Sequence, residues 1–109
     1  METTKTVEFP IRRSKSGYYF RFRKAYDNGG KTFDRYTVTF EVYDEKTGKW
    51  EVCRDGFKIV ALGMSEHPFH PQGFGQSCNC VEGRHLGKRV KFSELPPDVQ
   101  RCVIQYLEN

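Results

Sequence analysis

A polar turn that runs directly into an alternating strand is the feature that most restricts how this chain can fold. Residues 27–30, Asp-Asn-Gly-Gly, are residue types that accept the positive φ angles of tight turns. Over residues 33–43 apolar and polar side chains then alternate, which predicts a strand with one buried face and one polar face. The predicted buried face carries Tyr36, Val38 and Phe40, and the predicted polar face carries Thr37, Thr39 and Glu41.

Further strands are predicted on both sides of this one. Residues 18–25 alternate in the same way before the turn, and residues 49–54 and 57–62 form two more extended runs after it. Asp55-Gly56, between those two runs, is typical of a type I′ hairpin, whose two central positions both need a positive φ. Residues 33–62 therefore predict a three-stranded antiparallel meander, and residues 18–25 add a fourth strand to it.

The end of the chain predicts a helix over residues 96–108. Pro97 suits a first-turn position, and Asp98 complements the positive end of the helix dipole. Residues 63–87, by contrast, show no periodicity and predict a long ordered loop. The apolar side chains of the predicted helix form one stripe, which consists of Leu95, Val99, Cys102, Val103, Tyr106 and Leu107.

These elements together predict a single α+β domain over residues 1–109. In it, one C-terminal helix packs on a four- to five-stranded antiparallel sheet, and the long irregular loop lies between them. A chain of 109 residues is long enough for one hydrophobic core but not for two.

Positive charge is concentrated near the N-terminus. Residues 1–24 hold seven basic and two acidic side chains, whereas the net charge of the whole chain is +4. A basic arm over residues 1–16 suggests an anionic partner. The alternative is an edge strand whose charges resist aggregation.

The compartment follows from what the sequence lacks. No apolar run is long enough to span a bilayer, and the first residues have no apolar core of a secretory signal. We therefore expect no membrane association and a cytoplasmic location. In that compartment the four cysteines would remain thiols.

Residues that could ligate a metal gather in the predicted loop. They are His67, His70, Cys78 and Cys80. Zinc favours four nitrogen and sulfur ligands, but a Cys-x-Cys pair is not the familiar zinc spacing. We predict scattered loop side chains and buried thiols here, with no metal and no other cofactor, and keep zinc as the alternative.

One strand face could contact nucleic acid. Tyr19, Arg21 and Arg23 share a face of the predicted strand over residues 18–25, where an aromatic ring and two cations could stack on bases and contact phosphates. The simpler interpretation is an ordinary solvent-exposed face.

A catalytic interpretation depends on Asp27, Asp34 and Arg35, which could join a histidine such as His85 in an acid–base set. No nucleotide-binding loop, nucleophile elbow or HExxH motif is present. By alternation Asp34 falls on the predicted core face, so we expect it to be a hydrogen-bonded structural anchor for the turn. Arg35 falls on the predicted polar face and is then the better candidate for contacting a partner.

Five blocks of the sequence carry a resemblance. They are YDNGGxTxDRYTV, GMSxxP, PQGFxQ, HLGKRV and LPxDVQ, and they lie within residues 26–38, 63–68, 71–76, 85–90 and 95–100. In these blocks the chain resembles a family of small bacteriophage and mobile-element proteins. The resemblance implies no activity, but it directs attention to turns and loops, where binding residues usually lie.

We therefore expect a non-enzymatic binding module from a phage or mobile element. Its partner is a host protein or an anionic ligand. A nucleic-acid-binding accessory protein and a small hydrolase or transferase, with a site around the turn and the long loop, are the alternatives. The predicted contact residues are Asn28, Arg35, Gln76, His85 and Lys88.

Overall fold

The computed structural model describes residues 12–13 and 19–108 of the chain. Most of the basic arm that we expected over residues 1–16 therefore lies outside the described residues. Within that arm Arg12 and Arg13 form a short strand, β2, that pairs antiparallel with the start of strand β3, Tyr19–Asp27.

The chain has an α+β fold in which every strand of the described residues belongs to one antiparallel sheet. Besides β2, its strands are Tyr19–Asp27 (β3), Tyr36–Asp44 (β4), Lys49–Val52 (β5), Arg54–Asp55 (β6), Lys58–Met64 (β7), Gly75–Cys80 (β8) and Lys88–Val90 (β9). Strands β3, β4 and β7 form the centre of the sheet, with β9 beside β3 at one edge and β8 beside β7 at the other.

The segment expected to be a loop over residues 63–87 contains regular structure, which corrects that expectation. Strand β7 continues to Met64, and β8 pairs with it from Ile59↔Cys80 to Met64↔Gly75. Backbone hydrogen bonds build this pairing, so β8 forms without an alternating apolar pattern. Only residues 65–74 and 81–87 lie between strands, and Arg84–Leu86 (η1) is a short 3-10 helix.

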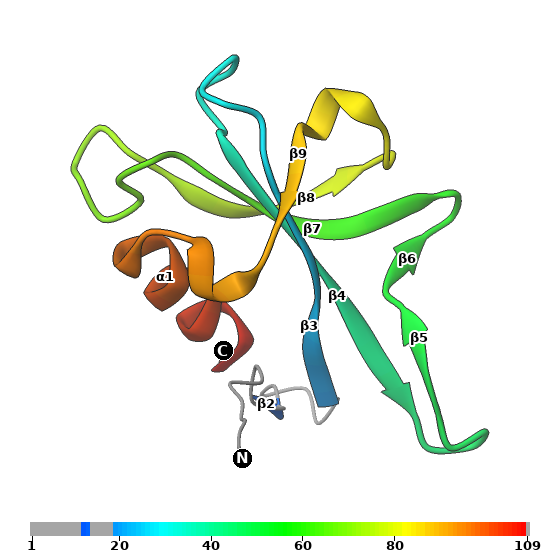
Figure 1. Ribbon diagram of the computed structural model, residues 1–109. Coiled ribbons are helices and arrows are strands. Elements are labelled where there is room, and N and C mark those ends of the chain that lie inside the picture. Colours follow the sequence, from blue (N-terminus) through cyan, green and yellow to red (C-terminus); the bar gives the residue numbers. More distant parts are fainter. Residues whose placement is uncertain (1–11, 14–18, 109) are drawn as a thin grey trace.

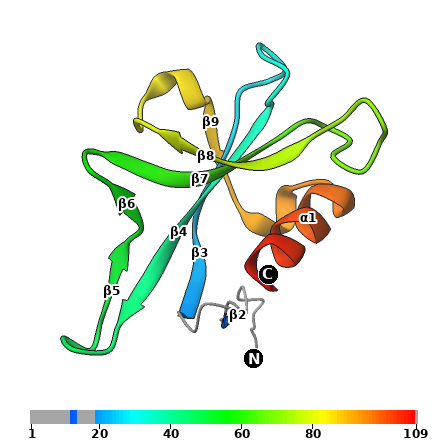
Figure 2. The same cartoon turned by 180° about the vertical axis from the view of Figure 1, so that it is seen from behind.

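On the side away from β3, strand β4 pairs with two different strands, because the sheet separates along the length of β4. Its first half pairs with β7 and its second half with β5 (Figure 1). Between β5 and β6, Cys53 bridges the gap: its N–H donates to the Phe40 carbonyl at 3.2 Å, and its carbonyl accepts from Val60 N–H at 2.8 Å. The β4–β5 hairpin then extends away from the helix, as the view from behind also shows (Figure 2).

The hairpin turn before β7 lies one residue later than predicted. Asp55 is paired with Lys58, so the two linking residues are Gly56 and Phe57. Gly56 has a φ of 66°, which suits glycine. The pairing of Asp55 with Lys58 sets this position. It moves the turn by one residue and leaves the hairpin in place.

The C-terminal helix α1, Pro97–Glu108, covers one face of the sheet. The predicted stripe faces the core: Leu95, Val99, Val103 and Leu107 are at most 3% exposed, and Cys102 and Tyr106 pack against them. Tyr106 stacks on Phe40 with ring centroids 5.4 Å apart. No helix within the described residues is long and apolar enough to cross a membrane.

The face of β4 that we expected to be polar is also buried. Thr37 is 6% exposed and Thr39 is 0% exposed. Residues 81–87 connect the two opposite edges of the sheet, from β8 to β9, and pass over this face. The hydroxyl of Thr39 accepts from Arg23 Nη1 at 3.3 Å and donates to the Lys24 carbonyl at 3.4 Å, so it is buried with partners.

Candidate functional site

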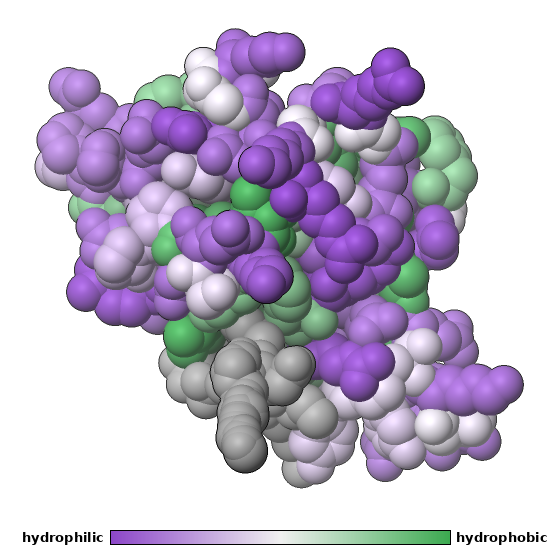
Figure 3. Space-filling model, viewed as in Figure 1, coloured by the Kyte–Doolittle hydropathy of each residue, from purple (hydrophilic) through white to green (hydrophobic). Residues whose placement is uncertain are grey.

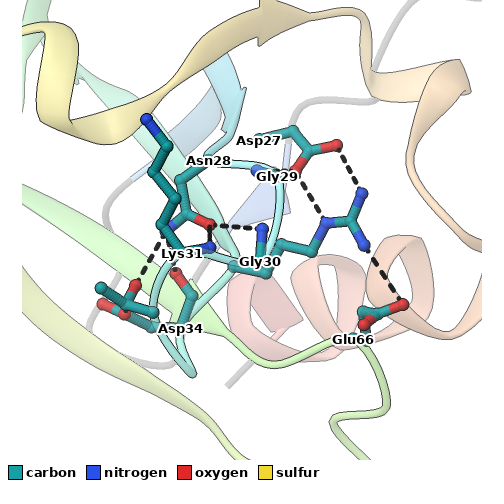
Figure 4. Close-up of polar contacts among 9 residues, drawn as sticks. Asp27, Asn28, Gly29, Gly30, Lys31, Asp34 and Glu66 are labelled. Carbon is teal, nitrogen blue, oxygen red and sulfur yellow. Dashed lines mark hydrogen bonds and ion pairs between the residues drawn. The ribbon is translucent and has the colours of Figure 1, made fainter.

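Asn28 organises the turn between β3 and β4. Its Oδ1 accepts hydrogen bonds from the backbone N–H groups of Gly30 at 2.8 Å and Lys31 at 3.0 Å. Its Nδ2 donates to Thr32 Oγ1 at 2.8 Å and to the Asp34 carbonyl at 3.3 Å (Figure 4). The Asn28 side chain, which we predicted as a ligand contact, is thus engaged in holding the turn.

The structure does not place Asp34 and Arg35 on opposite faces of a strand, as we predicted. Strand β4 begins at Tyr36, so the strand alternation does not reach either residue. Asp34 is exposed rather than buried on the core face, and its carboxylate accepts a hydrogen bond from Thr32 Oγ1 at 2.5 Å. The expectation of a buried Asp34 anchor was therefore wrong.

Arg35 is the residue that ties the turn to a second loop. Its Nε and Nη2 donate to the two carboxylate oxygens of Asp27 at 2.8 and 3.2 Å. Its Nη1 lies 3.2 Å from Glu66 Oε1, in the segment after β7 (Figure 4). The hydrogen bond from Arg35 is the largest of several effects that lower the pKa of the Asp27 carboxyl below its usual value.

The second loop, residues 65–74, is closed at its base by Ser65 and Phe74. Ser65 N–H donates to the Phe74 carbonyl at 2.9 Å, and Phe74 N–H donates to Ser65 Oγ at 3.0 Å. Inside the loop, His70 N–H donates to the His67 carbonyl, and Gly73 N–H donates to the His70 carbonyl. A Cβ at Gly73 would overlap the carbonyl oxygen of His67, so only glycine fits this close approach.

A pocket of about 490 Å³ lies between the turn and this loop. We call it the Arg35 pocket. Phe33 forms part of its wall: the ring is 62% exposed and is supported by Phe74, with centroids 5.1 Å apart. The lining residues are Gly30, Lys31, Thr32, Phe33, Arg35, Ser65, Glu66, His67, His70, Gln72 and Gly73.

Some polar groups that line the pocket form hydrogen bonds within the loop of residues 65–74. His70 Nδ1 accepts a hydrogen bond from Gln72 N–H at 3.1 Å, so the ring proton resides on Nε2 and makes that atom a donor. In Figure 4 the Lys31 side chain extends away from Glu66, the residue that pairs with Arg35. The guanidinium of Arg35 is therefore the cationic group whose place in the wall is fixed.

The other predicted contact residues do not line this pocket. Lys88 lies opposite Asp27 in the β3–β9 pairing, and its charge contributes to lowering the pKa of Asp27. Gln76 lies in β8 opposite Gly63, and His85 lies in η1. All three side chains are exposed, and of the predicted set only Arg35 is in the pocket wall.

On the predicted nucleic-acid face, both arginines form ion pairs with carboxylates. Arg21 Nε lies 2.7 Å from Glu41 Oε1, and its guanidinium lies over the Trp50 ring at 4.3 Å. Arg23 donates to both carboxylate oxygens of Glu82, at 2.7 and 3.1 Å. Tyr19, the third residue of that face, is 37% exposed.

Glu82 also accepts a hydrogen bond from the Tyr26 hydroxyl at 2.5 Å. Hydrogen bonding by Arg23 lowers the pKa of Glu82 to about 2, and burial together with Glu82 raises the pKa of Tyr26 to about 12. This cluster attaches residues 81–87 to the sheet, which accounts for the buried threonines beneath.

The four residues considered for zinc are not brought together. His67 and His70 line the Arg35 pocket, whereas Cys78 and Cys80 are half-buried in β8. Nowhere in residues 12–13 and 19–108 does a group of three or more His, Cys, Asp or Glu side chains form a metal-binding arrangement. Burial raises the pKa of both thiols.

Sequence reasoning missed Glu66, Ser65 and Gly73 as parts of the site. Each acts through a tertiary contact, with Arg35, Phe74 or His67, and short-range patterns do not report such contacts. The closely spaced Pro68, Pro71 and Gly73 are the signal that a compact loop forms here.

Comparisons of this chain with protein-family models, with curated proteins and with solved structures found no match.

Proposed function

We propose that this protein is a binding module for a small anionic ligand, which it holds in the Arg35 pocket. The observation that carries the proposal is the guanidinium of Arg35, fixed in the pocket wall by Asp27 while its Nη1 faces the exposed Glu66. A guanidinium held from one side offers its remaining N–H groups to an oxyanion with little loss of rotamer freedom.

Two further properties of the pocket support this function. Its volume of about 490 Å³ lies in the range typical of small-molecule sites. Both loops around it are held by internal hydrogen bonds, from Asn28 on one side and Ser65 on the other. Such preorganisation favours binding because less conformational entropy is lost when the ligand enters.

The alternatives have weaker support. Arg21 and Arg23 are paired with Glu41 and Glu82, and neither arginine lines the Arg35 pocket. On the face drawn in Figure 3, hydrophobic areas are small and scattered among hydrophilic ones, which does not favour an apolar protein interface there. Asp27 is held as an ionised partner of Arg35, so we propose no acid–base step for it. A phage or mobile-element origin and a cytoplasmic location stay predictions.

Titration of the ¹⁵N-labelled protein with inorganic phosphate and with phenyl phosphate, followed by amide and arginine Nε–H resonances, tests the proposal. We expect saturable shifts at Arg35 and in residues 65–74. Arg35→Lys should weaken binding about tenfold or more, since lysine lacks the planar set of donors. Arg84→Lys, at an exposed cation outside the pocket, is the matched control and should bind as the wild type. Absence of saturable shifts with either probe at millimolar concentration would refute the proposal.

A further inference from the structure

Arg35 has two carboxylate partners that differ in how firmly they are held. Asp27 accepts two hydrogen bonds from Arg35, and its side chain is 24% exposed. Glu66 makes a single contact at 3.2 Å, and its side chain is 54% exposed. A solvent-exposed single contact of this kind contributes little to stability and exchanges readily. Glu66 is therefore the partner that can be displaced without disturbing the turn.

From this difference we infer that Glu66 is an internal competitor at the ligand site. Its carboxylate makes the contact with Arg35 Nη1 that an incoming oxyanion must take over, and the ligand that takes it over is an aromatic phosphate monoester. The inference rests on the proposed function and adds both the ligand class and the means by which the site is controlled.

We expect a phosphate group in the ligand because the ligand must compete with Glu66 for Arg35. Glu66 is tethered to the pocket wall, so its effective concentration near Arg35 is on the order of millimolar or higher. A free carboxylate ligand carries the same charged group as Glu66, so at concentrations below this value it competes poorly with Glu66 for Arg35. A phosphate monoester carries about −1.5 to −2 charge near neutral pH and three acceptor oxygens, which makes it the stronger partner for the guanidinium.

The aromatic part follows from Phe33. Its ring lines the pocket and is 62% exposed, yet Phe74 supports it at a centroid distance of 5.1 Å. A ring held in place with a large accessible area is a stacking surface, and aromatic pairs gain from offset or edge-on contact. A ligand ring that packs on Phe33 places its phosphate within the same pocket as Arg35.

The experiment compares three probes on four proteins by calorimetric titration. The probes are phenyl phosphate, inorganic phosphate and benzoate, and the proteins are the wild type and the variants Glu66→Gln, Phe33→Leu and Glu45→Gln. Glutamine keeps the size of Glu66 but removes the charge that competes for Arg35. Glu45 is an exposed glutamate outside the pocket, so Glu45→Gln controls for the change in net charge.

We expect Glu66→Gln to tighten phenyl phosphate binding about tenfold and to make benzoate binding measurable, whereas Glu45→Gln changes neither. Phe33→Leu should weaken phenyl phosphate about tenfold and leave inorganic phosphate within about twofold. If the wild type binds phenyl phosphate and Glu66→Gln binds it no more tightly, the competitor role is refuted while the proposed function stands. Equal binding of phenyl phosphate and inorganic phosphate by the wild type refutes the aromatic ligand class. If neither the wild type nor Glu66→Gln binds any probe, both proposals fail.

Discussion

The carboxylate of Asp27 and the guanidinium of Arg35 face each other across the polar turn and share two hydrogen bonds, at 2.8 and 3.2 Å. The backbone reinforces this contact, because Asn28 N–H donates to the Arg35 carbonyl at 3.0 Å. The turn is thus closed at its base by side chains and main chain together. Through Nη1 the same arginine also reaches Glu66, so one guanidinium contacts both of the loops that form the pocket.

The stability of the turn should depend on Asp27 and not on Asp34. Asp27→Asn removes the charge that pairs with Arg35 and should lower the melting temperature. Asp34→Asn, at an exposed site, retains an acceptor for the Thr32 hydroxyl and should leave the melting temperature within about 1 °C. Thermal unfolding of both variants measures the difference, and a lower melting temperature for Asp34→Asn alone would reverse the assignment.

The acid sensitivity of the fold should depend on Glu82. Its pKa is depressed in the native protein, from a usual 4.5 to about 2. A depressed pKa means that the stabilisation is present above pH 4.5 and is lost as the pH falls towards about 2. Glu82→Gln should therefore be less stable than the wild type at neutral pH and should lose less stability over that acid range.

Urea unfolding at a series of pH values measures this dependence. Glu45→Gln, an exposed carboxylate in the turn after β4, should keep the acid dependence of the wild type. Parallel stability curves for the wild type and Glu82→Gln below pH 4.5 would contradict the role given to the Arg23–Glu82 contact.

The loss of folding stability at high pH should depend on Tyr26. Its pKa is raised from a usual 10.0 to about 12, so the stabilisation is present below pH 10 and is lost as the pH rises towards 12. Tyr26→Phe should flatten the loss of stability over this range. If the Tyr26→Phe variant loses as much stability between pH 10 and 12 as the wild type does, the Tyr26 hydroxyl contributes nothing to stability over this range.

The docking of α1 should depend on Leu107. This side chain is 2% exposed within the apolar stripe, and Leu107→Ala should cost about 2–5 kcal/mol of unfolding free energy. Gln105→Ala, on the exposed side of the same helix, should change stability by less than about 0.5 kcal/mol. Chemical denaturation compares the two, and equal midpoints would place the helix differently.

The shape of the Arg35 pocket should depend on Gly73. Gly73→Ala places a methyl group against the carbonyl of His67, so residues 65–74 must rearrange and ligand binding should be lost. Gly83→Ala is the matched control, because Gly83 has an extended backbone with a φ of 174° and its Cβ would meet only the movable ring of His85. Amide spectra of the two variants should differ from the wild type mainly in residues 65–74 for the first and hardly at all for the second.

Local patterns were sufficient to predict the α+β class, the positions of β3, β4 and β7, and the buried stripe of α1. Periodicity predicts these because alternation along a strand and the 3.6-residue repeat of a helix depend only on neighbours in sequence. Tyr36, Val38 and Phe40 are buried as their spacing predicts, and so are Val99, Val103 and Leu107.

Pairing between distant segments decided the rest. Strand β8 exists because β7 offers it a free edge, and Thr37 and Thr39 are buried because Glu82 attaches residues 81–87 above them. Neither cause leaves a pattern in the residues that it affects. Alternation assigned Asp34 to the core, although β4 begins only at Tyr36 and Asp34 lies in the exposed turn.

The sequence by itself thus determined which segments extend, which segment coils and where the apolar stripe lies. Only the tertiary structure decided that Arg35 joins Asp27 to Glu66 and that the turn and the loop enclose one pocket. The physical reason is the range of the interactions. Propensity and periodicity act over a few residues, whereas an ion pair or a shared cavity depends on where the folded sheet brings separate loops together.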